Sequence, residues 1–432
     1  MTNSSRDAWL DQLERTATAY FLHEVDADTG LVRDNSGDGA PATIAGTGFA
    51  LSSYAIAAER GYLTRDDAAE RTRRALSFLW NAPQGEDDDT IGAHGFFYHF
   101  LDMQSGRRVW KCEVSTIDST ILFAGALTAA AYFDRDTPVE REIRHTADAL
   151  YRRADWTWAL DHGPMVSLGW RPERGFLRYR WSGYSEALLL YVLGLGSPTH
   201  PLPPTCYAEW CKGYKWKTIY GYSMVYAGPL FIHQLSHGWI DFHGIRDAYM
   251  TARNTDYFEN SRRATYVQRE YAVRNPRNFL GYNVESWGIT ASDGPGPATR
   301  YIDGKRRRFW HYRARGVPNG PDDGTLSPWA VVASLPFAPE IVVPTVEAIQ
   351  EHHPELARGY GFACSFNPTF STPGDGPSGW VSPAHYAINQ GPVVLMVENV
   401  RSELVWRLMR GCPYVVDGLR RAGFSGGWLN GA

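Results

Sequence analysis

Two carboxylates stand at the beginning of strongly apolar segments. Glu186 lies in WSGYSEALLLYVLGLGSP (residues 181–198), where an apolar run follows it and ends at Gly196. Asp118 lies in WKCEVSTIDSTILFAGAL (residues 110–127), shortly after Glu113. The helix dipole stabilises a carboxylate in the first turn of a helix, and this is one interpretation of both positions. The other is that they face a cleft, where an apolar and aromatic setting would raise the pKa of Glu186 and keep it protonated near neutrality.

A third polar segment, LFIHQLSHGWIDFHGIRD (residues 230–247), contains His233, Gln234, His237 and Trp239. Its first two histidines are one helical turn apart, a spacing that can bind a metal ion. The residues between them are Gln, Leu and Ser instead of the Glu of an H-E-x-x-H motif, and the segment offers no third ligand. We therefore expect these side chains to bind sugar hydroxyls or core carbonyls, and we expect no metal.

Two later segments carry further carboxylates and amides. GYNVESWGITASDGPG (residues 281–296) contains Glu285, Trp287 and Asp293 among turn-forming residues, and Asp293-Gly294 is by itself a common turn. YAINQGP (residues 386–392) contains Asn389 and Gln390 at the start of another apolar run. The density of Gly and Pro predicts that the first of these segments is a loop.

Carboxylates, amides and aromatic rings that cluster in loops are typical of the active sites of enzymes that cleave glycosidic bonds. One protonated carboxyl gives a proton to the leaving oxygen, while a second carboxylate activates water or attacks the sugar. The sequence has no G-x-S-x-G elbow, no P-loop and no G-x-G-x-x-G between a strand and a helix, so no cofactor is expected. Many of the 16 Trp, 24 Tyr and 19 Phe fall in loop-like stretches, where flat rings suit stacking on sugars.

Helical periodicity recurs along almost the whole chain, interrupted by long Gly- and Pro-rich loops. We predict helices at 6–23, 46–60, 64–81, 116–132, 138–153, 184–195, 226–236, 245–273, 325–335, 340–352, 384–396, 399–410 and 413–421. Helices joined alternately by short and long loops indicate a closed ring, so the predicted fold is an all-α (α/α)6 barrel, or toroid, with its long loops on the active face. Residues 1–424 are expected to form a single catalytic domain, and residues 425–432 a flexible tail.

Composition narrows the class of protein further. The chain has 432 residues, 44% of them hydrophobic and 21% charged, which is enough apolar material for a large core. A net charge of −4 with both signs interspersed argues against nucleic-acid and membrane partners. The five Cys include no C-x-x-C pair and fit neither a disulfide scaffold nor a standard zinc site.

The first residues show helical spacing where a signal peptide would have a basic and an apolar region, so a cytoplasmic location is expected unless a leader was removed. The oligomeric state is left open.

A set of motifs resembles one known family. In order along the chain they are TGLVRDNS, TIAGTGFALSSYAIAAERGYLTRDDAAERT, EVSTIDSTILFAGAL, GYSEALLLYVLGLGSPTHPLP, PLFIHQLSHGWIDFHGIRD, GYNVESWGITASDGP, SLPFAPE and INQGPVVLMVENVRSELVW. Between about residues 28 and 424 the chain is similar to the bacterial glucoamylase-like domain of glycoside hydrolase family 144 and related β-1,2-glucan-active families. The set is specific to this domain and much less specific to one substrate.

The resemblance implies an (α/α)6 barrel that cleaves β-1,2-glucan without a metal, mostly with inversion, while a related transglycosylating branch is retaining. The carboxylates on which such families rely fall on Asp118 and Glu186, with Glu285 as the second acid of the retaining branch. Two residues depart from the family pattern: Ser185 replaces the usual Asn, and Asn389 replaces the usual Asp of I-D-Q-G-P. Because an amide does not act as a base at neutral pH, Asn389 predicts another base, another substrate or another stereochemical outcome.

We therefore predict a β-1,2-glucanase-like glycoside hydrolase that acts on an oligo- or polysaccharide. Glu186 is the predicted general acid, Asp118 the predicted base or sugar-binding group, and Glu285 the rival second carboxylate. The predicted substrate-binding residues are Trp181, Tyr184, His233, Gln234, His237, Trp239, Trp287, Asp293, Asn389 and Gln390. Two alternatives stay open: a retaining glycosidase or transglycosylase on a different glycan, and a non-catalytic carbohydrate-binding protein.

Overall fold

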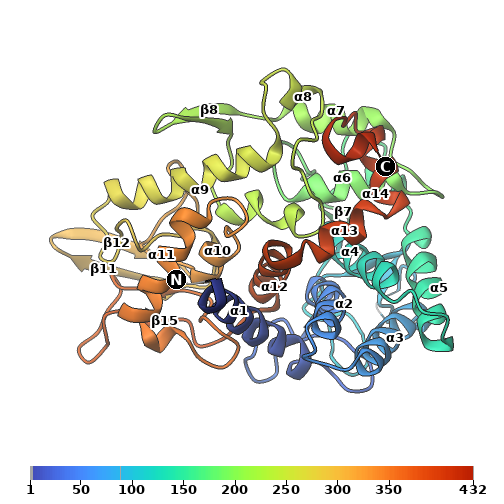
Figure 1. The fold of residues 1–432 in the computed structure, drawn as a ribbon, viewed down its shortest axis with the longest axis horizontal. Coiled ribbons are helices and arrows are strands. Elements are labelled where there is room, and N and C mark those ends of the chain that lie inside the picture. The colour runs from blue at the N-terminus through green and yellow to red at the C-terminus, as the bar shows by residue number, and fades with distance from the viewer. Residues whose placement is uncertain (1–2, 88, 432) are drawn as a thin grey trace.

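Helices dominate the computed structural model, which describes residues 3–87 and 89–431 (Figure 1). The helices are α1 (Asn3–His23), α2 (Ile44–Glu59), α3 (Arg65–Asn81), α4 (Thr116–Tyr132), α5 (Pro138–Arg153), α6 (Ala187–Gly196), α7 (Pro204–Lys212), α8 (Ala248–Thr251), α9 (Tyr257–Arg274), α10 (Pro328–Val332), α11 (Pro339–His352), α12 (Ala387–Ser402), α13 (Leu404–Arg410) and α14 (Pro413–Arg421). The prediction of a helix-rich fold is confirmed.

Side-chain caps fix the starts of several helices. The side chain of Ser115 accepts a hydrogen bond from the backbone N–H of Asp118 at the start of α4, and Thr137 caps α5 through Glu140 in the same way. A Ser or Thr followed three residues later by an acid is a strong start signal in a sequence. This is why the predicted helices 116–132 and 138–153 have the observed bounds.

Three stretches differ from the predicted helices. Residues 226–236 are not an α-helix: two 3-10 helices, Leu230–His233 and Leu235–Gly238, follow Pro229. The predicted helix 245–273 is divided into α8 and α9, because Asp256 caps a new helix start. Helix α7 lies in a stretch predicted as loop, and Pro204 occupies its first turn, where the missing N–H has no intrahelical partner to lose.

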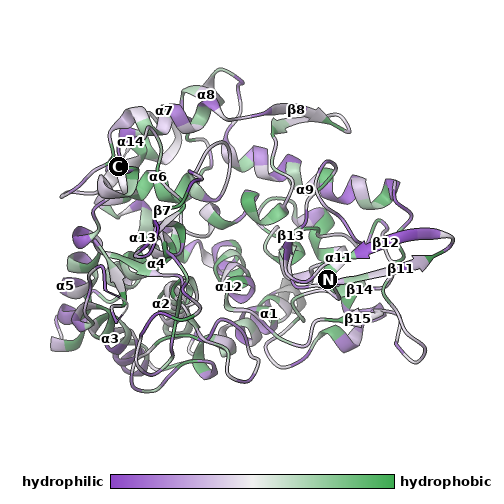
Figure 2. Cartoon of the chain, turned by 180° about the vertical axis from the view of Figure 1, so that it is seen from behind, coloured by the Kyte–Doolittle hydropathy of each residue, from purple (hydrophilic) through white to green (hydrophobic). Residues whose placement is uncertain are grey.

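Helices α2, α4, α6 and α12 form the centre of the molecule. Almost every residue along them is buried, whereas α3 and α5 bury one face only. Figure 2 shows the same division, with hydrophobic colours on the central helices and hydrophilic colours on the outer ones. One hydrophobic core contains residues from Leu10 to Leu429.

Glycines allow two pairs of helices to touch through their backbones. A Cβ on Gly125 of α4 would lie 1.9 Å from the carbonyl oxygen of Gly48 in α2. A Cβ on Gly196 of α6 would lie 1.9 Å from the carbonyl oxygen of Tyr414 in α14. Since no side chain fits between the partners, close packing fixes the separation within each pair.

The largest sheet has five antiparallel strands in the order β2–β3–β5–β6–β7. They are β2 (Gly92–Ala93), β3 (Phe96–Tyr98), β5 (Val114–Ser115), β6 (Gly169–Arg171) and β7 (Gly175–Phe176). Strands of two or three residues are too short to give more than a weak alternating pattern in the sequence. Because β5 leads directly into α4, the sheet adjoins the end of that helix at which Asp118 lies.

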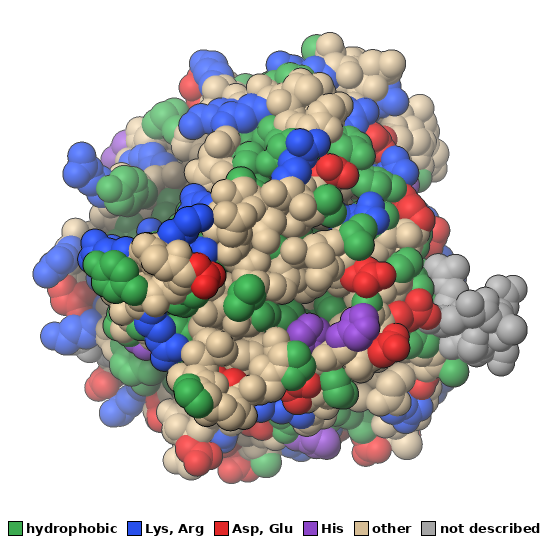
Figure 3. Space-filling model, turned by 90° about the vertical axis from the view of Figure 1, so that its left-hand side faces the viewer, with side chains coloured by type: hydrophobic (Ala, Val, Ile, Leu, Met, Phe, Trp, Pro, Cys, Tyr) green, Lys and Arg blue, Asp and Glu red, His purple; other side chains and the backbone are tan. Residues whose placement is uncertain are grey.

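The remaining strands form two-stranded units. They are β1 (Ala42–Thr43) with β4 (Phe100–Leu101), β8 (Trp216–Ile219) with β9 (Tyr222–Val225), β10 (Ala291–Ser292) with β13 (Arg313–Ala314), β11 (Ala298–Ile302) with β12 (Lys305–Phe309), and β14 (Phe366–Asn367) with β15 (Trp380–Val381). The β11–β12 hairpin extends outward, with Arg307 and Phe309 buried and Arg306 and Arg308 exposed. Figure 3 shows Lys and Arg side chains on this side of the molecule.

The segment after residue 424 differs from the predicted flexible tail over residues 425–431. Leu429 is buried, and the indole Nε1 of Trp428 donates a hydrogen bond to the carbonyl oxygen of Asp241 at 2.8 Å. Ser425 pairs through its backbone with Arg246. Within residues 3–87 and 89–431, the helices fall short of the length and apolar character that a membrane crossing requires.

Candidate active site

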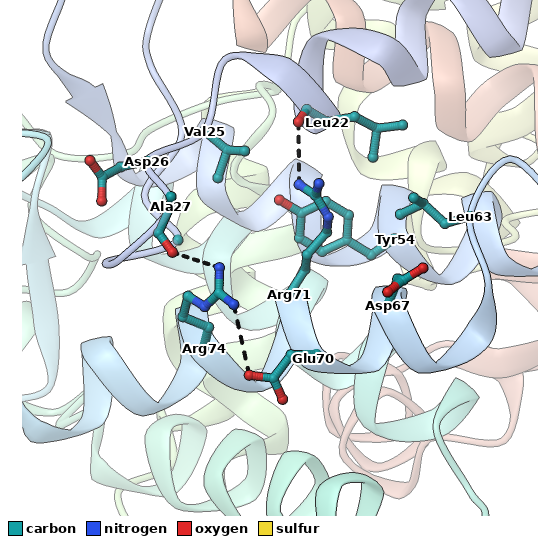
Figure 4. A pocket seen from close by; sticks show the side chains of 11 residues that line it. Leu22, Val25, Asp26, Ala27, Tyr54, Leu63, Asp67, Glu70, Arg71 and Arg74 are labelled. Atoms are coloured by element: carbon teal, nitrogen blue, oxygen red, sulfur yellow. Dashed lines mark hydrogen bonds and ion pairs between the residues drawn. The ribbon is translucent and has the colours of Figure 1, made fainter.

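Two cavities of similar size differ in what their side chains can do. One, of about 540 Å³, lies beside the end of α1 and the exposed face of α3 (Figure 4). Its cations are already engaged: Arg71 donates to the carbonyl oxygen of Leu22 and Arg74 to that of Ala27. Figure 4 shows both guanidinium groups pointing at those carbonyls, and Arg74 also lies 3.8 Å from Glu70. These contacts tie the segment after α1 to α3.

The second cavity, of about 530 Å³, lies among the N-terminal ends of the central helices and contains the groups of a hydrolytic site. Its polar lining consists of Asp34, Asn35, Thr43, His99, Asp118, Glu186, Tyr312, Tyr386 and Asn389. The rest is apolar or aromatic: Ala45, Phe100, Ile117, Ile121, Phe231, Leu235, Ala291, Trp329 and Ile388. We call this cavity the central pocket. Carboxyl groups in a mostly apolar cavity are a common basis for acid–base catalysis.

Glu186 immediately precedes α6 and lines the central pocket. Its side chain forms no capping hydrogen bond, so the helix does not use this carboxylate to satisfy its first N–H groups. Burial, and to a smaller degree the charge of Asp118, raises the pKa of Glu186 from 4.5 to about 7. A carboxyl with this pKa is partly protonated at neutral pH and can donate a proton.

Asp118 lies in the first turn of α4, with its two oxygens in different settings. The hydroxyl of Ser115 donates to Oδ2 at 2.5 Å, and His99 Nε2 lies 3.6 Å from the same oxygen. Oδ1 makes no hydrogen bond within the described part of the chain, although the residue lines the pocket. That oxygen is therefore free to accept a proton or a hydroxyl from a bound molecule.

Asp34 is a third carboxyl group of the pocket and was not predicted. It lies between α1 and β1, where the side-chain amide of Asn35 donates to its Oδ2 at 3.1 Å. Burial raises its pKa above the usual value. Asp34 belongs to the motif TGLVRDNS, so the resemblance pointed to the segment without identifying this residue.

Asn389, in the first turn of α12, also lines the pocket. It is only 1% exposed, and neither its Oδ1 nor its Nδ2 has a hydrogen-bond partner within the described residues. Leaving a buried amide unpaired is costly, by roughly 1–3 kcal/mol. An amide in this position is poised to bind the hydroxyl groups of a ligand.

Glu285 is not part of the central pocket. The structure places it on the exposed Asn283–Ser286 turn, where its backbone N–H donates to the side chain of Asn283 at 2.8 Å. Glu285 therefore lies apart from Asp118 and Glu186 in this structure, because the turn keeps its side chain at the surface.

Several residues predicted to bind sugars lie in the core instead. Trp239 is fully buried against Phe49, with its Nε1 donating to Ser52 Oγ at 3.0 Å, and Trp287 Nε1 donates to Thr345 Oγ1 at 2.9 Å. Both indoles satisfy their polar atom inside the protein. They therefore pack the interior and present no face to a ligand.

The polar residues of the same segment also contact groups in the protein core. Gln234 donates to the carbonyl oxygen of Ala330 and to Ser334 Oγ, with distances of 2.6 and 2.7 Å. His233 lies 3.2 Å from the carbonyl oxygen of Ala227, and His237 lies 3.0 Å from Ser261 Oγ. Burial lowers the pKa of His233 to about 4 and that of His237 to about 3. These histidines are neutral core residues.

Four other predicted residues lie outside the lining of the central pocket. Trp181 Nε1 donates to Thr116 Oγ1 at 3.0 Å and thereby supports the start of α4. Tyr184 stacks on Tyr257. Asp293 Oδ2 accepts a hydrogen bond from Ser382 Oγ at 3.1 Å.

Gln390, the fourth of these residues, is buried and lies 3.4 Å from His385, beside a small cavity of its own. Of all the predicted site residues, the central pocket therefore brings together Glu186, Asp118 and Asn389.

The sequence analysis also missed His99, Tyr312 and Tyr386, which line the pocket. His99 belongs to GFFYHFL and Tyr312 to GKRRRFWHYRARG, two stretches outside the predicted helices. Tyr386 lies two residues before the INQGP motif. A residue at the junction of a short strand and a loop has no local signal that reports which cavity it faces.

Comparisons with known proteins give a matching family and several similar proteins. The family model "Glycoamylase", described as "Putative glucoamylase", matches residues 178–413. A curated relative from Parabacteroides distasonis, an "Exo beta-1,2-glucooligosaccharide sophorohydrolase (non-reducing end)", is 27% identical over 447 residues, which cover 95% of this chain and 57% of the relative. The chain thus spans little more than half the length of that protein.

Two solved structures have similar folds over their whole length. A Bacteroides uniformis protein with the same glucoamylase description superposes with a TM-score of 0.85 at 30% identity, with 98% of both chains covered. An endo-β-1,2-glucanase from Chitinophaga pinensis, solved with sophorotriose and glucose, superposes with a TM-score of 0.80 at 27% identity. That match covers 98% of this chain and 99% of the other.

Proposed function

Since the chain belongs to the glycoamylase family, we propose that it is a glycoside hydrolase that cleaves β-1,2-linked glucan in the central pocket. One observation carries the proposal: Asp118 on α4 and Glu186 immediately before α6 line one largely apolar cavity, and burial raises the pKa of Glu186 to about 7. The named activities of the Parabacteroides and Chitinophaga relatives support the choice of linkage.

The proposed architecture is an (α/α)6 barrel that acts as a single catalytic domain. The buried helices α2, α4, α6 and α12 form part of the inner ring, and the one-sided helices α3 and α5 belong to the outer ring. The pocket lies at the N-terminal ends of the inner helices α4, α6 and α12, where loops converge. Such an end favours the binding of anionic and hydroxyl groups through the helix dipoles.

In the proposed reaction Glu186 is the general acid. It gives its proton to the oxygen of the glycosidic bond as that bond breaks, and it suits this step because its carboxyl, with a pKa of about 7, is partly protonated at neutral pH. Asp118 accepts a proton from the attacking water through its free Oδ1. Asn389 binds a sugar hydroxyl, which satisfies an otherwise unpaired amide. Tyr312 and Trp329 supply aromatic surface for the sugar rings.

The predicted alternative of a retaining enzyme relied on Glu285 as its second acid. Because Glu285 lies on an exposed turn outside the pocket, that version of the retaining mechanism loses its nucleophile. We therefore propose hydrolysis with a water molecule as nucleophile and Asp118 as base. The anomer that is released first shows whether cleavage inverts or retains the configuration at the anomeric carbon, and we expect inversion.

A substrate panel tests the proposal. Purified protein is incubated with β-1,2-, β-1,3-, β-1,4- and α-1,4-linked glucans, and the products are separated by chromatography. We expect cleavage of β-1,2-glucan, with the first product resolved by NMR as the inverted anomer. Binding of β-1,2-glucan by calorimetry without any product would instead identify a carbohydrate-binding protein and overturn the proposal.

A further inference from the structure

His99, Glu113 and Arg171 stand side by side across three neighbouring strand segments. In the β3–β5 pair, Phe97 faces Ser115 and Tyr98 faces Val114, so the next step of the register puts His99 opposite Glu113. The backbone bond from His99 N–H to the carbonyl oxygen of Glu113, at 2.9 Å, continues that ladder.

On the other side, Val114 faces Trp170 in the β5–β6 pair, which puts Glu113 opposite Arg171. Directly opposed side chains of this kind interact across a sheet. We call the three residues the charged row.

The side chains of the charged row are in contact. Arg171 Nη2 lies 3.2 Å from Glu113 Oε2, and His99 Nδ1 lies 3.1 Å from Glu113 Oε1. The His99 ring stacks on Phe100 with 3.9 Å between ring centroids, which fixes the plane of the imidazole. Its other nitrogen, Nε2, lies 3.6 Å from Asp118 Oδ2 in the central pocket. The charges therefore alternate from Arg171 through Glu113 and His99 to Asp118.

The titratable groups that face His99 come from three elements. They are Glu113 beside β5, Asp118 on α4 and Asp34 on the segment between α1 and β1. Burial alone would lower the pKa of His99, but these three carboxylates outweigh it and raise the pKa to about 9. The hydrogen bond with His99 is the main cause that lowers the pKa of Glu113 to about 2.

We propose that the charged row is a positioning device: Arg171 and Glu113 hold His99 as an imidazolium ion against Asp118 Oδ2, which fixes the position of the Asp118 carboxyl and leaves its Oδ1 free to act. This inference rests on the proposed function for its catalytic meaning. His99 is a positioning residue, because it acts on the base and not on the glycosidic bond.

The first test does not need activity. The imidazole signals of the 13 histidines are followed by ¹⁵N NMR over pH, and the signal lost in His99→Gln is assigned to His99. We expect His99 to titrate well above the ordinary histidine value of about 6.5. In Glu113→Gln its titration should move to lower pH, because the carboxylate that stabilises the imidazolium is gone. An ordinary titration that is unchanged in Glu113→Gln would overturn the inference.

The second test is steady-state kinetics on β-1,2-glucan. If His99 holds the Asp118 carboxyl in place for the reaction, His99→Gln should lower kcat more than it changes KM, because substrate binding does not depend on the base. A kcat equal to that of the wild type would contradict the proposed role.

The chain offers a matched control at His243. This histidine lies 2.5 Å from Asp241 Oδ1, its ring stacks on Phe258, and Arg410 contacts the same aspartate, but the group is remote from the central pocket. His243→Gln removes an equivalent histidine and should leave kcat and KM unchanged. If the wild type cleaves no β-1,2-glucan, the proposed function fails, while the NMR titration still decides on the charged row.

Discussion

Asp118, in the first turn of α4, and Glu186, immediately before α6, face one pocket, yet their carboxyl groups have different surroundings. Asp118 Oδ2 accepts a hydrogen bond from Ser115 and lies 3.6 Å from His99 Nε2. Glu186 makes no capping bond, and burial favours its neutral form. Two carboxyl groups in such different surroundings can supply an acid and a base at the same pH.

Replacing Glu186 with Gln should abolish most of the activity. The amide keeps the shape of the side chain but has no acidic proton, and general acid catalysis contributes about 10²–10⁴-fold to a rate. We expect a loss of kcat in this range on β-1,2-glucan, measured by product release. Glu285→Gln is the matched control, because Glu285 is an exposed glutamate outside the pocket, and it should retain wild-type kinetics. An equal loss in both variants would rule out Glu186 as the specific acid.

Stability should depend on pH through Glu186. Its pKa is about 7 in the folded protein and 4.5 ordinarily, so the folded state holds this proton more tightly than the unfolded state does. The stabilisation is complete below about pH 4.5 and is lost as the pH rises through 7. Relative to the wild type, Glu186→Gln should therefore gain stability between these values, by at most about 3 kcal/mol at pH 8. Urea unfolding at pH 4 and pH 8 measures the difference, and an equal effect at both values would contradict the pKa.

Replacing Asn389 with Asp should lower activity. The new carboxylate would lie in a pocket that already holds Asp34, Asp118 and Glu186, and like charges raise one another's pKa values. The exchange also removes the amide N–H donor, and the loss of one hydrogen bond to a bound sugar costs about 1–2 kcal/mol, so we expect kcat/KM to fall about tenfold near neutrality. Steady-state kinetics on β-1,2-glucan provide the measurement. A clear gain in turnover would show that the pocket lacks a base and that Asn389 occupies its place.

Trp239→Phe should affect stability and not substrate affinity. The smaller ring leaves a void beside Phe49 and removes the hydrogen bond to Ser52, at a cost of about 1–3 kcal/mol in the free energy of unfolding. Because Trp239 is fully buried, KM for glucan should stay unchanged. A raised KM together with wild-type stability would instead show that Trp239 contacts the sugar.

Helix positions were predictable wherever a cap and an apolar period coincide. Ser115 before α4 and Thr137 before α5 are such cases, and both helices have their predicted bounds. Asp118 and Glu186 were found for a related reason, since a charge at the start of an otherwise apolar helix stands out in a sequence. The structure places both at one cavity.

The sequence could not separate buried polar residues from ligand-binding ones. His237 and Trp239 are close in sequence to other polar groups, but their partners, Ser261 and Ser52, are distant in the chain. The same limit explains the omission of His99. Its importance depends on a register that joins residues 99, 113 and 171, and two of the strands involved are only two and three residues long.

The contact of α2 with α4 at Gly48 and Gly125 has a consequence for how such an enzyme can diversify. Asp118 sits on α4 and Glu186 precedes α6, and glycine contacts clamp both helices to their neighbours. The packing of the helices thus fixes the separation between the carboxyl groups of Asp118 and Glu186. Loops bearing Tyr312 or Tyr386 can be exchanged for others, and with them the preferred glycan, while the proton-transfer geometry survives the exchange.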